Sequence, residues 1–324
     1  MMTRTATAIA HPNIAFIKYW GNTNDALRLP ANASLSMNLD GLQAETTLTW
    51  ADDLSADTLV LNDAEQSGEP LQRVVRQLDI MRKRLGLTAH AQVVSKNNFP
   101  TGAGVASSAA AFAALTVAAA GASGQVLSEQ ELTTLARLGS GSASRSVPAG
   151  FVEWFAGDSH EASYAESFAQ PSHWPLVDVI AVISDGHKRV GSTAGHKSAQ
   201  TSIFQEARVA DAAARFAACR RAVVERDFNT FAEVVERDSN LMHAVMMTSV
   251  PPLFYWEPQS LAVMSWVRDR RADGLSVCYT LDAGPNVHCL CLEKDAEAVR
   301  SGLVGMSGLK QVYMAAVGGP AHLV

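Results

Sequence analysis

Polar and apolar residues alternate over several short stretches near the start of the chain, as they do in half-buried strands. This alternation predicts strands at residues 32–38 and 46–50, and residues 5–11 are also strand-like. A helical pattern covers residues 71–85, and its arginines and lysine are typical of a solvated helix face. A further strand is expected at 91–95, followed by a helix that begins near Val105 and ends near Ala120.

From residue 151 onward, the chain combines longer helical patterns with apolar runs of strand length. Two helices are expected within 207–247, with Asp227 as the cap between them. Further helices are predicted at 257–271 and 293–302, and strands at 151–155, 176–183, 276–281, 287–292 and 309–316. The proline-containing segment 170–175 is the best boundary, and it divides the chain into domains at 1–174 and 175–324.

Composition limits the classes of function. The chain has 324 residues, 48% of them hydrophobic and 18% charged, so it can bury a substantial core. A net charge of −6 argues against general nucleic-acid binding and favours a small anionic ligand for local basic clusters. No signal peptide or membrane-length apolar run is evident, so we expect a cytoplasmic protein. The four cysteines form no CxxC pair, which predicts buried thiols rather than a zinc site.

The stretch 97–114 (NNFPTGAGVASSAAAFAA) has the order of a strand, a glycine turn and a helix N-terminus. Gly102 and Gly104 allow close approach of a ligand, and Ser107 and Ser108 open the helix. Unpaired amides at a helix N-terminus bind anions, most naturally phosphate. The stretch is not a Walker A loop, because no GK[ST] follows at the required spacing. The alternative is an ordinary glycine turn that starts a core helix.

Three more positions carry candidate chemistry. Lys18 lies in an apolar run and needs an anionic partner, unless it is a surface lysine at a strand end. Residues 139–145 (GSGSASR) follow a helix with Ser128 and Glu131 as its capping box. Their hydroxyls and Arg145 suit an oxyanion, although a surface linker is the alternative. Asp282 lies between two apolar strands. It is either a catalytic carboxylate or a turn residue that bonds its own backbone.

Four stretches together resemble the mevalonate diphosphate decarboxylases of the GHMP kinase superfamily. They are PNIAFIKYWG (12–21), NNFPTGAGVASSAAAFAAL (97–115), GSGSASRS (139–146) and DAGPN (282–286). The resemblance implies an α+β fold, with an N-terminal half similar to ribosomal protein S5 domain 2 and a ferredoxin-like C-terminal half. It also implies a homodimer with its active site in the cleft between the halves, and an ATP- and Mg²⁺-dependent reaction of isoprenoid biosynthesis. In that reaction the 3-hydroxyl of a mevalonate derivative is phosphorylated, and phosphate and CO₂ are then lost.

The resemblance also assigns roles to residues. Asp282 is expected to orient or deprotonate the 3-hydroxyl, and Lys18 to offset negative charge on the transferred phosphoryl group. Ser140, Ser142 and Arg145 are expected to hold the substrate carboxylate and phosphate, with Tyr19, Asn22 and His196 at the substrate phosphate. The ATP phosphates would be bound by the glycine-serine loop of Gly102, Gly104, Ser107 and Ser108, with Ser108 also a Mg²⁺ ligand.

Two departures from the family pattern affect the substrate. The usual KYWGK ends here in Asn22, and the usual SS-x-x-GM is GSTAGH (191–196), followed by Lys197. Loss of one charge-assisted hydrogen bond, worth roughly 1.5–3 kcal/mol, weakens preference for a diphosphate. We therefore expect mevalonate 5-phosphate as substrate and isopentenyl phosphate as product. The alternatives are a mevalonate 5-diphosphate decarboxylase, with His196 or Lys197 restoring the charge, a mevalonate 3-kinase that does not decarboxylate, and a non-catalytic nucleotide-binding or dimerisation module.

Overall fold

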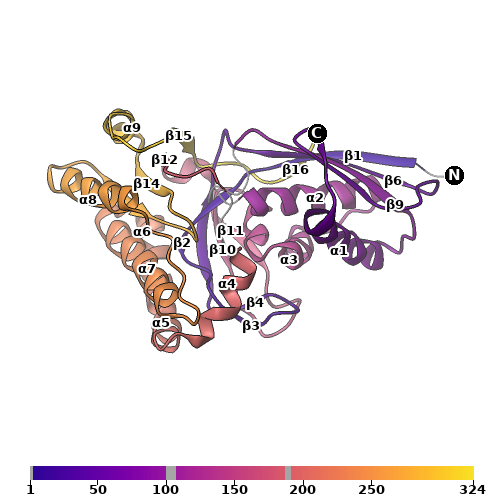
Figure 1. Ribbon diagram of the computed structural model, residues 1–324, viewed down its shortest axis with the longest axis horizontal. Coiled ribbons are helices and arrows are strands. Elements are labelled where there is room, and N and C mark those ends of the chain that lie inside the picture. Colours follow the sequence, from indigo (N-terminus) through magenta and orange to yellow (C-terminus); the bar gives the residue numbers. More distant parts are fainter. Residues whose placement is uncertain (1–2, 100–106, 187–190) are drawn as a thin grey trace.

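A computed structural model describes residues 3–99, 107–186 and 191–324 of the chain. These residues form a six-stranded sheet, two four-stranded sheets and a two-stranded sheet. The N-terminal half, indigo to magenta, and the C-terminal half, orange to yellow, lie at opposite ends of the long axis (Figure 1). β2 (Asn13–Ile17) and β10 (Phe151–Trp154) run near the middle of the molecule.

The remaining strands are β1 (Thr3–Ala10), β3 (Asn22–Asn24), β4 (Leu29–Pro30), β5 (Ser34–Asn38), β6 (Ala44–Ala51), β7 (Thr58–Leu61), β8 (Ala64–Glu65), β9 (His90–Asn97), β11 (Ala165–Ala169), β12 (Leu176–Val182), β13 (Val277–Thr280), β14 (Val287–Leu292), β15 (Gln311–Ala316) and β16 (His322–Leu323). The helices are α1 (Gly68–Leu85), α2 (Ser107–Ser123), α3 (Glu129–Gly139), η1 (Gly141–Ser146), η2 (Pro171–His173), α4 (Ser192–Ser198), η3 (Ala199–Thr201), α5 (Gln205–Ala210), α6 (Ala212–Glu225), α7 (Phe228–Thr248), α8 (Pro258–Ala272) and α9 (Glu293–Val304).

The first sheet has the strand order β16-β1-β6-β9-β7-β8, and α2 packs against β1 and β6. The alanines of α2 are almost all buried, and such small side chains let a helix lie close to a sheet. β16 pairs with β1 in antiparallel register, with Leu323 opposite Ala8, so the chain end returns to the N-terminal half (Figure 1). The residue pattern does not predict this two-residue strand. The domain division at 174/175 stays a prediction.

The second sheet, β11-β10-β5-β2, lies between the two ends of the molecule. The expected strand at 32–38 forms as β5, but the expectation that it is half-buried is wrong, because every residue of β5 is buried. Its apolar residues Leu35 and Met37 join a core shared with Ile180 and Phe231 of the C-terminal half. Its serines lie in the protein interior as well, where Ser34 contacts a buried arginine.

The third sheet is antiparallel, with the order β13-β14-β12-β15. Val177 and Val179 of β12 pack with residues of α8 and α9 on one face. On the other face, α7 contacts both β13 and β2, and Phe231 meets Phe16 edge to face with ring centroids 4.9 Å apart. A helix of the C-terminal half therefore joins the strands that lead into Lys18 and Asp282.

Most predicted elements form close to their expected limits. Asp227 caps α7, as predicted, by accepting from the backbone N–H groups of Asn229 and Thr230. The first helix predicted within 207–247 is divided instead into α5 and α6 at Asp211. The four cysteines are free and buried, as expected. In the ranges that the structure describes, no helix is long and apolar enough to span a bilayer.

Candidate active site

Two residues from opposite ends of the chain meet as an ion pair. Lys18 directly follows β2, and Asp282 lies two residues after β13, yet Lys18 Nζ is 2.7 Å from Asp282 Oδ1. The Lys18 side chain is 1% exposed and that of Asp282 is 28% exposed. Burial lowers the pKa of Lys18, and the Asp282 carboxylate opposes this shift. Lys18 thus has the anionic partner that an apolar environment requires, and it is not a surface lysine.

Arg145 is held in one orientation beside this pair. It lies on η1, 3% exposed, with Nη1 donating to Ser34 Oγ at 2.8 Å and Nε donating to Asn13 Oδ1 at 3.2 Å. Its guanidinium carbon is 5.6 Å from the centroid of the Trp154 ring. Burial lowers the pKa of Arg145 to about 10, against the opposing effect of Asp282, so the group stays charged near neutral pH. The segment that carries it is buried, and it is not a surface linker.

The structure brings the serine-rich start of α2 beside the GSGSASR turn. Ser108 Oγ lies 3.2 Å from Ser140 Oγ, and both side chains are partly or mostly buried. Ser107 begins α2, whereas Gly102 and Gly104 lie outside the described residues. The Ser142 carbonyl on η1 accepts from Asn13 Nδ2 at 3.1 Å. Two predicted oxyanion-binding segments are therefore neighbours.

Tyr19, Asn22 and His196 form a second group. Tyr19 OH donates to Asn22 Oδ1 at 2.5 Å, and the Tyr19 ring stacks on the His196 ring with centroids 4.0 Å apart. Burial raises the pKa of Tyr19 to about 12, so its hydroxyl keeps its proton. Asn22 and His196 of this group line a cavity of about 260 Å³, together with Asp25, Ala26, Arg28 and Lys197. An anion in this cavity would meet the cationic side chains of Arg28 and Lys197 and also the carboxylate of Asp25, which accepts from Asn22 Nδ2 at 2.8 Å.

His196 does not replace the lysine that the family pattern has at position 22. Its ring is buried, and Nδ1 accepts from the Gly21 N–H at 3.0 Å. Burial, followed by the charges of Arg28 and Arg208, lowers the pKa of His196 to about 3. The ring is therefore neutral near pH 7, and the suggestion that His196 restores the missing charge is wrong. Lys197 remains a candidate.

Buried neutral histidines predict acid sensitivity. The pKa values of His196 and His243 are both lowered to about 3, chiefly by burial, from 6.5. The unfolded chain binds these protons first as pH falls, so stability is lost below pH 6.5. Each histidine should remove about 1.5 kcal/mol from the free energy of unfolding between pH 6.5 and pH 5. Urea unfolding at both pH values should show that His243→Gln loses less stability than wild type. If wild type and His243→Gln lost equal stability between the two pH values, the prediction would be wrong.

Several residues around the site escaped the sequence analysis. Asn13 and Ser34 hold Arg145, and both lie next to or within segments that had been singled out, so the sequence offered a weak signal for them. Arg208 and Asp238 bond the backbone of Lys18 from helices of the other half. In the sequence these two are ordinary charged positions of helical patterns, and nothing local distinguishes them.

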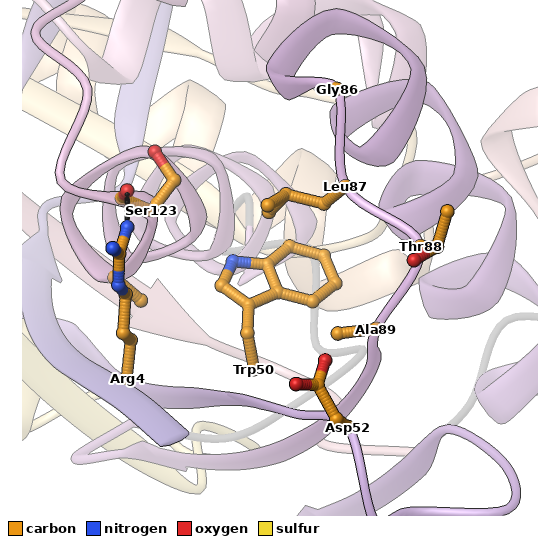
Figure 2. Close-up of a pocket in the computed structure, with 9 residues that line it drawn as sticks. Arg4, Trp50, Asp52, Gly86, Leu87, Thr88, Ala89 and Ser123 are labelled. Carbon is orange, nitrogen blue, oxygen red and sulfur yellow. Dashed lines mark hydrogen bonds between the residues drawn. The ribbon is translucent and has the colours of Figure 1, made fainter. Parts of the chain in front are cut away.

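A separate, smaller cavity of about 140 Å³ lies at the far end of β1 (Figure 2). Trp50 occupies its centre, with Asp52, Thr88 and Ala89 on one side. Arg4 borders the other side and donates to the Ser123 carbonyl at 2.6 Å. None of the predicted site residues lines this cavity.

Comparison with known proteins gives matches over nearly the whole chain. Residues 10–165 match the diphosphomevalonate decarboxylase-like N-terminal domain, and residues 178–316 match the mevalonate 5-diphosphate decarboxylase C-terminal domain. The diphosphomevalonate decarboxylase of Aspergillus fumigatus is 41% identical over 94% of this chain and 80% of its own length. The human diphosphomevalonate decarboxylase is 39% identical over 89% of this chain and 76% of its own length.

Solved structures agree with the sequence matches. A structure described as MDDEF in complex with MVAPP, AMPPCP and magnesium is 38% identical, with a TM-score of 0.94 over 100% of this chain and 99% of that chain. The mevalonate diphosphate decarboxylase of Staphylococcus aureus is 36% identical, also with a TM-score of 0.94, over 100% of this chain and 98% of that chain.

Proposed function

Because this chain belongs to the diphosphomevalonate decarboxylase family, with the α+β fold of the GHMP kinases, we propose that it catalyses ATP-dependent decarboxylation of mevalonate 5-diphosphate. The products are isopentenyl diphosphate, ADP, phosphate and CO₂. What supports this activity most directly is the meeting of Lys18 and Asp282 at 2.7 Å, next to the buried cation of Arg145. A non-catalytic module would not require these three side chains at one place.

The roles of the residues follow from their positions. Asp282 accepts a hydrogen bond from the 3-hydroxyl and takes its proton as the oxygen attacks the γ-phosphoryl group of ATP. Lys18, close to this carboxylate, offsets the negative charge on the transferred group. Arg145, fixed by Asn13 and Ser34, binds the substrate carboxylate with a planar pair of donors until CO₂ leaves. Phosphate departs from C3 at that stage, and a carbon–carbon double bond forms.

ATP and Mg²⁺ are the proposed cosubstrate and metal. Ser107 and Ser108 begin α2, whose N-terminal amides suit the phosphates of ATP. Within the described residues, no group of three or more His, Cys, Asp and Glu side chains is arranged to hold a metal ion. This fits Mg²⁺, which proteins commonly bind through few side-chain oxygens together with substrate phosphates and water. Ser108 is the proposed protein ligand, and the ion would neutralise phosphate charge. The homodimer and the cytoplasmic location stay predictions.

The substrate differs from the one that Asn22 alone suggests. The relatives named above are diphosphate enzymes, which favours the diphosphate alternative over the monophosphate expectation. The structure offers a physical reason, since Arg28 and Lys197 line the same cavity as Asn22. Their two positive charges exceed the single negative charge of Asp25 in that cavity, so they would attract a terminal phosphate in place of the missing lysine.

A direct comparison of substrates tests this proposal. With ATP and Mg²⁺, kcat/KM should be at least about tenfold higher for mevalonate 5-diphosphate than for mevalonate 5-phosphate, the value of one charge-assisted hydrogen bond. Arg28→Gln and Lys197→Gln should each reduce that preference, and Asn22→Lys should increase it. A preference of the wild type for the monophosphate would support the alternative substrate.

The close approach of η1 to Tyr19 gives a second prediction. A Cβ added at Gly141 would lie 2.5 Å from Tyr19 Cε1, and the Tyr19 ring cannot retreat because Trp154 and His196 pack against it. Gly141→Ala should therefore raise KM for the mevalonate substrate about tenfold, the value of a displaced hydroxyl contact. KM for ATP should change little. Gly305→Ala, directly after the end of α9, is the control, because its Cβ would meet nothing closer than 3.6 Å, and it should leave both values unchanged.

A further inference from the structure

Helix α7 touches the backbone beside both members of the Lys18–Asp282 pair. β2 ends at Ile17, and the next backbone donor, Lys18 N–H, bonds Asp238 Oδ2 on α7 at 2.6 Å. β13 ends at Thr280, and the next backbone donor, Leu281 N–H, bonds Ser239 Oγ on α7 at 3.0 Å. Asp238 and Ser239 are adjacent in the sequence and both are fully buried. Two consecutive residues of α7 therefore accept hydrogen bonds from the first backbone N–H after β2 and the first backbone N–H after β13. These two strands come from different halves of the molecule.

A buried network holds the first of these contacts in place. Asp238 Oδ1 accepts from Arg215 Nε at 2.8 Å, and Arg215 Nη2 donates to the Arg208 carbonyl at 2.9 Å. Arg208 Nη2 in turn donates to the Lys18 carbonyl at 2.7 Å. The peptide groups on both sides of Lys18 are therefore fixed by side chains of α5, α6 and α7. Since each of these bonds is buried, shifting the backbone of Lys18 would leave polar groups without partners.

We propose that Asp238 and Ser239 are positioning residues, which set the separation of Lys18 and Asp282 by fixing the backbone next to each of them. Neither residue needs to touch the substrate. Holding reacting groups in place is worth a large factor in rate, because a displacement of about 1 Å can cost about a hundredfold. The inference rests on the function proposed above, so its test includes a measurement that needs no turnover.

Ser239→Ala is the discriminating change, because it removes the acceptor for Leu281 N–H without altering any charge. The charged groups that act on Lys18 are Asp282 and Asp238, which raise its pKa, and Arg145, which lowers it. The buried rings of His243 and His288 also lie within electrostatic range of Lys18. All of these residues remain in the variant. A change in the pKa of Lys18 would therefore report a change in geometry.

NMR of protein labelled with ¹³C-lysine measures the pKa of Lys18. The chain has seven lysines, so the number of signals is small, and the signal that disappears in Lys18→Arg belongs to Lys18. Ser239→Ala should lower the pKa of Lys18 by about one unit, the change expected if the 2.7 Å ion pair lengthens to about 3.5 Å at an effective dielectric constant of about 20. In the pH dependence of kcat, the decrease at high pH should move to lower pH by the same amount as the pKa of Lys18. At the pH optimum, kcat should fall at least about tenfold, while KM for ATP and KM for the mevalonate substrate stay within about threefold of the wild-type values.

Ser249→Ala is the matched control. Ser249 is a buried serine at the end of the same helix, and its hydroxyl bonds the carbonyls of Met246 and Pro251. This variant should lose comparable stability and keep both kcat and the pKa of Lys18. If Ser239→Ala does not fold, Ser239→Cys, which keeps the shape but weakens the acceptor, should show a smaller shift in the same direction.

The outcomes separate the two proposals. An unchanged Lys18 pKa and an unchanged kcat in folded Ser239→Ala would overturn the positioning role, even in an active decarboxylase. A lowered Lys18 pKa in a protein that does not decarboxylate any mevalonate phosphate would support the positioning role and overturn the proposed function.

Discussion

Asp282→Asn should lower kcat by about 10³-fold or more, since a general base contributes about 10²–10⁴-fold and electrostatic stabilisation adds to it. The substitution keeps the shape of the side chain but removes the charge that faces Lys18 at 2.7 Å. The 3-hydroxyl then has no base, and the buried ammonium of Lys18 loses the carboxylate with which it forms an ion pair. Both effects act on the transition state, so KM for ATP should change much less than kcat.

Steady-state kinetics with a coupled ADP assay would measure the effect. Asp273→Asn is the matched control, because Asp273 is exposed at the end of α8 and pairs only with Arg270 among the contacts of its side chain that the structure gives. It should keep wild-type activity. The double variant Lys18→Met with Asp282→Asn should be about as slow as the slower single variant, since residues that act as a unit are not additive. A loss of less than about tenfold in Asp282→Asn would contradict the assigned role.

Arg145→Lys should uncouple the two halves of the reaction. Lysine keeps a positive charge but cannot bond Ser34 and Asn13 in the plane in which the guanidinium does, nor lie over Trp154 in the same way. The substrate carboxylate would lose its oriented partner, so kcat/KM should fall about a hundredfold, the value of one or two charge-assisted hydrogen bonds. Because phosphoryl transfer does not depend on this contact, ADP should form in excess of CO₂.

Measuring ADP and CO₂ in the same samples tests this prediction. Arg137→Lys is the control for loss of a buried guanidinium, because Arg137 is equally buried and burial also lowers its pKa to about 10. Arg137 bonds the carbonyls of Leu27, His160 and Ser163 rather than the partners of Arg145. Its variant should lose stability yet release ADP and CO₂ in equal amounts. Equal release by Arg145→Lys would show that the arginine does not hold the carboxylate.

Local patterns were enough to predict most elements and the principal charged residues. Lys18 stood out because a lysine within an apolar run requires a partner, and that partner is Asp282. Alternation identified β5, but it could not show that a second layer covers the polar face of that strand. β16 is only two residues long, and its pairing with β1 depends on residues more than 300 positions away.

The supports of the site were not predictable for the same reason. Asp238 and Arg208 have the spacing of ordinary helix residues, and their partners lie about 200 positions earlier in the chain. His196 looked like an extra cation in the sequence, whereas burial makes it neutral. Asn22 pointed to a smaller substrate because the sequence offered Lys197 only as an alternative cation and gave no sign that Arg28 lies beside it. The residue types were enough to indicate the chemistry of the site. The charge state of a group such as His196 depends on how it is packed, which the sequence does not show.

The most direct test of the central claim is a single-turnover reaction with ATP, Mg²⁺ and mevalonate 5-diphosphate labelled at the carboxyl carbon. ADP and labelled CO₂ should form in a 1:1 ratio, together with isopentenyl diphosphate, and neither should form without ATP. ADP without CO₂ would identify a 3-kinase. No turnover of the diphosphate, under conditions where the protein is folded and binds ATP, would show that the chain is not a mevalonate 5-diphosphate decarboxylase.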